Sequence, residues 1–457
     1  MPNDLLTTGQ ERYVYDIREG INFITQKILA FKLLLGIGFY ALGFSFFGTF
    51  VNTYFTLYLG IQGLEQNEQG LYVAFTLGAG AILYMIGALL GGTFSDDLRT
   101  RLGPRIPLII VSSVLAGFLM IFADPLLSVL GNGLPAYFLV FAGIFFLLGT
   151  SASPWNALVS DLLSKERRAW SALVTASLTT IGVGAGILVI APLIKNAQNT
   201  SLIWIICGLV LIISTIVSAI LIPKVNPDFE PDATLPDLLK SPQYLFSFGK
   251  GDFSQMFWIS LLWGVASTTL SSFFAFYVRS SLGFPENDLT LFMIITAATG
   301  LVVAIPAGFL CNFLGKANTG ILASLTMALF FLILFLIPGY NGMILSSIMG
   351  GIAGMLLTTV GVALPADLMP EGKEGQFWSF ILISRQVSAP LALALGGILI
   401  YAFNNFILLF VINAGLMVIA AVGMLFIGYE RLSLEDYLRF HRRFLRARKR
   451  KTIRERN

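Results

Sequence analysis

The residues best suited to a specific task lie in a charged stretch between two long apolar runs, from Gly91 to Arg105. The small residues Gly91 and Gly92 let two membrane helices approach closely. Asp96 can accept hydrogen bonds from free backbone N–H groups at the start of a neighbouring helix. The arginines of the stretch favour the cytoplasmic side of a membrane. The stretch therefore predicts a charged hinge between two membrane helices.

The residue inventory argues against catalytic and metal chemistry. The two cysteines, Cys207 and Cys311, lie in separate apolar runs, and the single histidine is His441, near the end of the sequence. These residues cannot form a metal cluster or a cysteine–histidine catalytic pair. We therefore expect a protein that is not an enzyme and that holds no cofactor and no metal ion.

The composition is that of a protein with many membrane spans. Hydrophobic residues make up 56% of the 457 residues, charged residues 12%, and the mean hydropathy is +0.81. Twelve runs are long enough to cross about 30 Å of hydrocarbon. They cover 31–59, 70–93, 105–123, 135–162, 171–194, 201–222, 255–279, 289–313, 318–338, 342–368, 378–402 and 404–428. We expect an all-α integral membrane protein with twelve transmembrane helices.

The positive charges predict the orientation in the membrane. Of the 29 Lys and Arg residues, only Lys195 and Arg279 fall on the outer side when the N-terminus is cytoplasmic. The positive-inside rule therefore predicts a multi-pass protein of the plasma (cytoplasmic) membrane with both termini in the cytoplasm. Residues 1–30 carry charges and no apolar core, so we expect no cleaved signal peptide.

The C-terminal tail is strongly basic. Eleven Lys and Arg residues lie between Arg431 and Arg456, which accounts for the net charge of +4 without a nucleic-acid partner. Such a tail either contacts anionic lipid headgroups or is solvated.

The sequence divides into two related halves. The proline-rich stretch 223–254 follows the sixth span and is typical of a linker. The end of the fourth span, 157–163, resembles the end of the tenth, 363–369, and a weaker copy of the charged stretch follows the eighth span at 308–316. We expect a cytoplasmic segment, a six-helix bundle, a cytoplasmic linker, a second bundle and a basic tail, at 1–30, 31–222, 223–254, 255–428 and 429–457.

Two motifs resemble those of a known transporter family. They are Asp96-x-x-Arg99-x-Arg101-x-Gly103-x-Arg105-x-Pro107 and Pro154-x-x-Ala157-Leu158-x-x-Asp161-Leu162. They resemble the major facilitator superfamily and, within it, the glycoside-pentoside-hexuronide cation symporter group, which includes melibiose-type permeases, sucrose-type carriers and a lysophospholipid symporter. The resemblance implies two pseudo-symmetric six-helix bundles, with spans 1, 4, 7 and 10 lining a central cavity and spans 2, 5, 8 and 11 beside it.

Polar and aromatic residues of these spans are the candidates for contact with a solute. The substrate-binding set is Asn52, Tyr54, Trp155, Asn156, Trp263, Arg385 and Gln386. Aromatic rings suit a sugar face or an acyl chain, and amides can hydrogen-bond hydroxyl groups. The alternative is that the tryptophans pack or lie at an interface, although a buried amide such as Asn52 or Asn156 needs a partner.

Arg385 is the only ionised residue well inside a span, at a cost of roughly 2.5–3.5 kcal/mol on insertion scales. Melibiose-type permeases carry a basic residue facing the cavity on the same span. We expect Arg385 to face the cavity and to use water, backbone carbonyls, Asp161 or Asp367, or the solute as its partner. The alternative is that its long side chain reaches back to the inner membrane surface.

The gating residues are expected at the cytoplasmic helix ends. They are Gly92, Asp96, Arg99, Arg101, Arg105, Asp161 and Asp367. Asp96 is expected to meet the start of the eleventh span near Gly375 and to pair with one of the arginines. Asp161 and Asp367 lie near basic residues, so they form either gating ion pairs or ordinary solvated pairs.

The expected function is secondary transport of a polar organic solute, glycoside-like or sugar-acid-like, by alternating access. A lipid or lysophospholipid carrier with a lateral opening lined by aromatics such as Phe46, Phe47, Phe273 and Phe274 is the alternative, and a non-transporting assembly factor is a third. The second span has no Asp or Glu, and the fourth has none before Asp161, so the Na⁺ site of melibiose-type permeases is in question. Coupling to H⁺, coupling to Na⁺ and uncoupled transport all stay open.

Overall fold

The computed structural model describes residues 31–428 apart from 65, 99, 101, 164, 196–199, 223–250, 370–373 and 404–405. All regular elements in these ranges are helices. The N-terminal segment, nearly all of the linker, the basic tail, Arg99 and Arg101 lie outside the described residues. The expected domain boundaries therefore stay a prediction.

The first half begins with an apolar helix from Phe31 to Asn52, and its last residues are π-helical. The elements that follow are η1 Phe50–Tyr54, α2 Phe55–Ile61, α3 Gln66–Asp97, α4 Ile106–Ile121, α5 Ala123–Val129, α6 Leu134–Leu162, α7 Lys165–Lys195 and α8 Thr200–Leu221. In the second half they are α11 Asp252–Phe276, η3 Tyr277–Ser281, α12 Glu286–Phe313, α13 Lys316–Leu336, α14 Tyr340–Leu368, α15 Glu374–Phe403 and α16 Phe406–Met424. A π-helical segment thus occurs near the end of the first long helix in each half.

Hydrophobicity and length identify most of these helices as membrane spans. Within the described residues, eight helices are long and apolar enough to cross a bilayer, or nine if α4 and α5 form one span. These two helices meet at an angle of 58°, and the break at Phe122 lies at the end of the run predicted over 105–123. Pro125 explains the break, because it has no N–H to donate to the carbonyl of Ile121. The chain is an all-α, multi-pass membrane protein.

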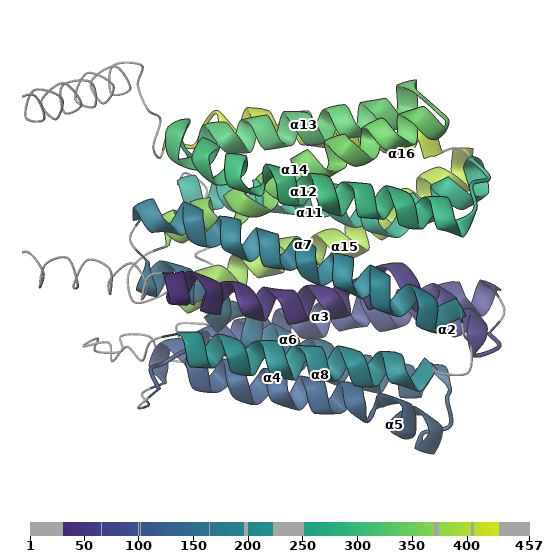
Figure 1. Cartoon of the computed structure of the whole chain (residues 1–457), viewed down its shortest axis with the longest axis horizontal. Helices are drawn as coiled ribbons and strands as arrows, with labels where there is room; N and C mark the ends of the chain where they lie inside the picture. Colours follow the sequence, from purple (N-terminus) through teal and green to yellow (C-terminus); the bar gives the residue numbers. More distant parts are fainter. Residues whose placement is uncertain are drawn as a thin grey trace, which may run out of the picture.

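The helices form two bundles that meet along a shared interface (Figure 1). Within the first half, α3 packs on α6, and α4 packs on α6 and α8. Within the second half, α13 and α12 pack on α14, and α11 packs on α15 and α16. Across the interface, α7 contacts α12 and α14, while α15 contacts α3 and α6. In Figure 1 these connecting helices, α7 and α15, lie between the two groups.

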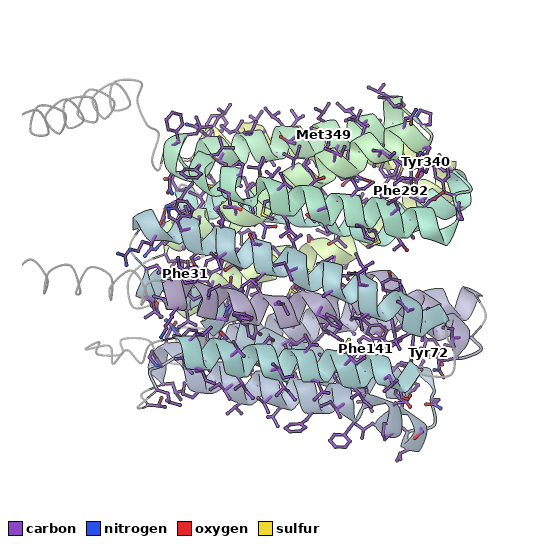
Figure 2. All side chains as sticks on the ribbon, viewed as in Figure 1. Phe31, Tyr72, Phe141, Phe292, Tyr340 and Met349 are labelled. Carbon is purple, nitrogen blue, oxygen red and sulfur yellow. The ribbon has the colours of Figure 1, made fainter. Side chains whose placement is uncertain are left out.

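The buried side chains show where the halves are joined. We call the end of the bundle where α8 ends and α11 begins the linker end; Figure 2 shows Phe31 at that end and Tyr72 and Tyr340 at the opposite end. One apolar cluster combines the second half with linker-end residues of the first half, such as Ile37 and Ala157. A second cluster holds other residues of the first half together with Leu382 of α15. The halves therefore share a core at the linker end, and toward the opposite end their buried apolar residues belong mostly to different clusters.

Candidate functional site

Arg105 forms the centre of an ion-pair cluster at the linker end. It lies just before α4 and is only 4% exposed. Its guanidinium pairs with Asp96, donates to Asp161 at 2.9 Å and lies 3.7 Å from Glu374. Burial alone would lower the pKa of Arg105, but Asp161 and Asp96 raise it above its usual value. We call these four residues the Arg105 cluster; Glu374 is the member contributed by the second half.

Asp96 connects the two halves through the start of α15. The backbone N–H groups of Gly375 and Gln376 donate to its carboxylate at 3.2 and 3.0 Å. These N–H groups have no partner within their own helix, and the positive end of the helix dipole favours a carboxylate there. The sequence predicted this contact with Gly375 and with one arginine. Its role in gating stays a prediction.

Small residues bring the helices close enough for this contact. A Cβ atom added at Gly92 would lie closer than 3.0 Å to Ser153 Oγ, Gly375 O and Ser379 Oγ. Ser153 Oγ donates to Gly375 O at 2.6 Å, so α6 and α15 are joined beside the Arg105 cluster. Ser379 Oγ donates to Ala88 O of α3 at 2.8 Å. The sequence pointed to Gly92 as a gating residue but gave neither serine a gating role, because serines are frequent in membrane helices.

A second ion-pair cluster joins the halves through Asp367. The side chain of Asp367, at the end of α14, is fully buried and pairs with Lys316 and with Arg168 of the first half, the latter at 3.0 Å. Arg168 also donates to Ala366 O at 2.7 Å and to Ser160 O at 2.8 Å. It thereby satisfies carbonyl groups at the ends of α14 and α6. We call Asp367, Lys316 and Arg168 the Asp367 cluster.

The Asp367 cluster resembles the Arg105 cluster with the charges reversed. One carboxylate lies between two basic residues, whereas Arg105 lies among three carboxylates. Lys316 ends the weaker copy of the charged stretch and begins α13, and Arg105 ends the first copy and lies just before α4. The sequence analysis named Asp161 and Asp367 but missed Lys316 and Glu374. The internal repeat was the available signal for Lys316, because it aligns the helix starts of the two halves.

The candidate solute residues of the first half lie in different surroundings. Asn52 is exposed, on the π-helical segment η1, whereas Tyr54 is buried in the apolar cluster of the first half. Trp155 donates its ring N–H to Ile37 O at 2.8 Å, and its ring centroid lies 4.9 Å from that of Tyr40. The Asn156 amide donates to Ala152 O of its own helix at 2.8 Å. The structure therefore does not bring these four residues into one group.

In the second half, Trp263 and Arg385 both lie beside Gly361. Arg385 is half-buried and donates from Nη2 to Gly361 O at 2.8 Å. A Cβ at Gly361 would lie 3.8 Å from the Trp263 ring, whose N–H donates to Ser324 Oγ at 2.9 Å. Gln386, beside Arg385 in the chain, is also half-buried. Binding by any of these residues stays a prediction.

The aromatic residues expected beside a lateral opening are mostly packed inside the protein. Phe46 and Phe47 are 3% and 2% exposed and belong to the apolar cluster of the first half. Phe273 and Phe274 are half-buried and pack against the other cluster.

Comparison with known proteins agrees with this architecture. A sequence model of the Major Facilitator Superfamily matches residues 33–343 and 256–452. No curated protein matches the chain.

Solved transporter structures have a similar fold. FucP in the outward conformation has a TM-score of 0.68 at 13% identity, over 88% of this chain and 99% of that one. The proton:xylose symporter XylE has a TM-score of 0.67 at 14% identity, over 90% and 98%. The human organic anion transporter MFSD10 (TETRAN) has a TM-score of 0.67 at 14% identity, over 87% and 98%.

Two helical bundles joined at one end by hydrogen bonds and ion pairs define a membrane transporter of the alternating-access class. The chain belongs to the Major Facilitator Superfamily, whose members are secondary transporters rather than enzymes.

Proposed function

We propose that this protein moves a polar organic solute, glycoside-like or sugar-acid-like, across the plasma membrane by alternating access. In this proposal both termini lie in the cytoplasm, and the linker end is therefore the cytoplasmic, or inner, end of the bundle. Asn52, Tyr54, Trp155, Asn156, Trp263, Arg385 and Gln386 are proposed to contact the solute. The resemblance of its motifs to the glycoside-pentoside-hexuronide group supports a hydroxylated solute.

The observation that carries this proposal is the closed linker end. The Arg105 and Asp367 clusters connect the halves there, and each connection uses polar contacts that water can replace. Opening of the inner end would separate these ion pairs and the apolar residues that the halves share there, such as Ile37 and Ala157, while most of the first-half core would stay together. Polar contacts of this kind suit a gate, because their net free energy is small compared with that of an apolar core.

Proton coupling, if present, would involve the gate carboxylates Asp96, Asp161 and Asp367. All three are ion-paired when the linker end is closed. Opening would separate Asp367 from Arg168 and Asp96 from α15, so both carboxylates would change partners during transport. Na⁺ coupling and uncoupled transport are the alternatives, and the basic tail is proposed to contact anionic lipid headgroups.

Reconstitution into liposomes tests the proposal. We expect saturable uptake of labelled sugars or sugar acids. A pair of spin labels at Leu102 and Asn318, which are exposed at the linker end of opposite halves, should show two distances, one for the closed and one for the open state. A single fixed distance without uptake would contradict transport. Translocation of a lysophospholipid without uptake of a soluble solute would favour the lipid-carrier alternative.

A further inference from the structure

Arg385 has an unusual electrostatic setting. The sequence places no Asp or Glu between 69 and 95, 125 and 160, 253 and 285, 289 and 366, or 375 and 429. The acids at the linker end, Asp96, Asp161 and Asp367, are engaged by Arg105, Arg168 and Lys316. Arg385 therefore brings a positive charge into the membrane interior that no carboxylate among the described residues balances.

The position of the guanidinium argues against an arginine that reaches back to the membrane surface. Arg385 lies eleven residues after the start of α15, or about 16 Å into the bundle. Its Nη2 atom is held by Gly361 O, seven residues before the end of α14, which is about 10 Å from that end. The charged group thus stays inside the bundle.

The surrounding helices leave space for this side chain. A Cβ atom at Gly361 would lie 2.7 Å from Nη2 of Arg385, and one at Gly264 would lie 3.3 Å from its Cα. One of the five guanidinium N–H groups donates to Gly361 O, and the others have no hydrogen-bond partner among the described residues. Arg385 is nonetheless only half-buried, so these donors border accessible space.

Tyr84 of the first half lies on α3, the helix of that half that packs against α15. Ser379 Oγ of α15 donates to Ala88 O of α3, and both Arg385 and Tyr84 lie farther from the linker end than this contact. Tyr84 is 12 residues before Asp96, about 18 Å from the linker end, and so at nearly the depth of Arg385. Among the described residues, its hydroxyl has no hydrogen-bond partner. A phenol O–H and a guanidinium at this depth on contacting helices of opposite halves can both donate to one oxyanion.

We propose that Arg385 and Tyr84 form an oxyanion site, so that the transported solute is an organic anion with a carboxylate or phosphate group. The planar guanidinium binds the anion through two parallel N–H groups, while Gly361 holds it in place. Tyr84 adds a third donor from the other half. The anion thereby contacts both halves, which is what a solute must do to influence their closure. This inference rests on the proposed transport function and narrows its substrate class.

Matched charged and neutral probes test the site. The pairs are D-glucuronate with its methyl ester and sn-glycerol 3-phosphate with glycerol. A lysophospholipid with the same glycerol phosphate group is a further probe, which shows whether the site takes the anion from a lipid or from a soluble solute. Binding is measured on the full-length purified protein from the shift of the thermal unfolding midpoint with probe concentration. We expect one acid of the panel to bind more tightly than its neutral partner.

Variants connect this preference to the two residues. Arg385→Gln should weaken binding of the acid about ten- to a hundredfold and leave the neutral partner nearly unchanged. Arg385→Lys should be intermediate, because it keeps the charge but loses the planar fork. Tyr84→Phe should cost about three- to tenfold. Arg279→Gln is the matched control, since it removes an arginine near the outer end of the seventh span.

Three results would overturn the oxyanion site: no acid binds, the neutral partners bind as tightly as the acids, or Arg385→Gln leaves the affinity for an acid unchanged. Each of these leaves the transport proposal intact if the Leu102–Asn318 distances still exchange. A single fixed distance would instead remove the transport function on which the site rests.

Discussion

Replacement of Asp96 with alanine tests whether the closed linker end depends on this carboxylate. Asp96 accepts hydrogen bonds from Gly375 and Gln376 at 3.2 and 3.0 Å, and both donors belong to the other half. These contacts can exist only while the linker end is closed. The ion pair with Arg105 lies within the first half and can persist in both states. Of the contacts that Asp96 makes, only the two hydrogen bonds from α15 therefore favour the closed state over the open state.

The size of the effect follows from these two hydrogen bonds. A hydrogen bond to a charged group contributes about 1.5–3 kcal/mol, and water replaces both bonds when the end opens. In the open state the N–H groups of Gly375 and Gln376 can donate to water instead. We therefore assign about 1.5–3 kcal/mol to the two hydrogen bonds together. That loss should shift the ratio of closed to open molecules by roughly 10- to 100-fold. The transport rate should fall, while the amount of folded protein should change much less.

Distance measurements between spin labels at Leu102 and Asn318 report the shift directly. Both labelled positions are exposed and lie in different halves at the linker end. Asp96→Ala should increase the population with the longer distance. Asp96→Asn should have a smaller effect, because an amide oxygen still accepts but carries no charge.

Asp124→Asn is the control, since Asp124 lies on α5, away from the linker end. Unchanged distances and normal turnover in Asp96→Ala would refute the gating role. Asp96 would then serve only to hold Arg105 within the first half.

Three further predictions concern the gate and the topology. Gly92→Ala should also favour the open state, because its Cβ would collide with α6 and α15. Gly184→Ala is the control, since no atom lies within 4 Å of its added Cβ. Equal Leu102–Asn318 distance distributions in the two variants would contradict this prediction. Asp367→Asn should lower the free energy of unfolding by about 3–5 kcal/mol, because buried Lys316 loses its carboxylate; an unchanged denaturant midpoint would exclude a stabilising pair. A cysteine at Ser433 should react only with reagents admitted to the cytoplasm, and one at Gln66 only from outside; labelling of both from one side would overturn the orientation.

Several features of the site were predictable because they depend on local sequence. A carboxylate beside small residues at a helix end suggests a contact with another helix start, and the structure has Asp96 against Gly375. The resemblance of 363–369 to 157–163 pointed to Asp367, which the structure pairs with Arg168 and Lys316.

Other parts of the site depend on how distant helices pack. The sequence could not distinguish a tryptophan that binds solute from one that packs, and Trp155 and Trp263 each donate their N–H to a group of another helix. Asn52 and Tyr54 are two residues apart and therefore lie on opposite faces of a helix, one exposed and the other buried. Which of the two faces packs against the apolar cluster depends on the neighbouring helices.

The sequence alone determined the fold class, the positions of the long apolar runs and the division into related halves. These properties follow from the order of residues along the chain. A membrane span needs a continuous apolar run that is long enough to cross the hydrocarbon layer, and such a run can be recognised without knowledge of its neighbours. Only the tertiary structure decided that Arg105 binds Asp96 and Asp161, that Arg168 reaches Asp367, and that Arg385 has Gly361 O as its partner. These pairings join residues up to 199 positions apart. They depend on which helix ends meet in space, and the spacing of residues within one helix carries no information about that.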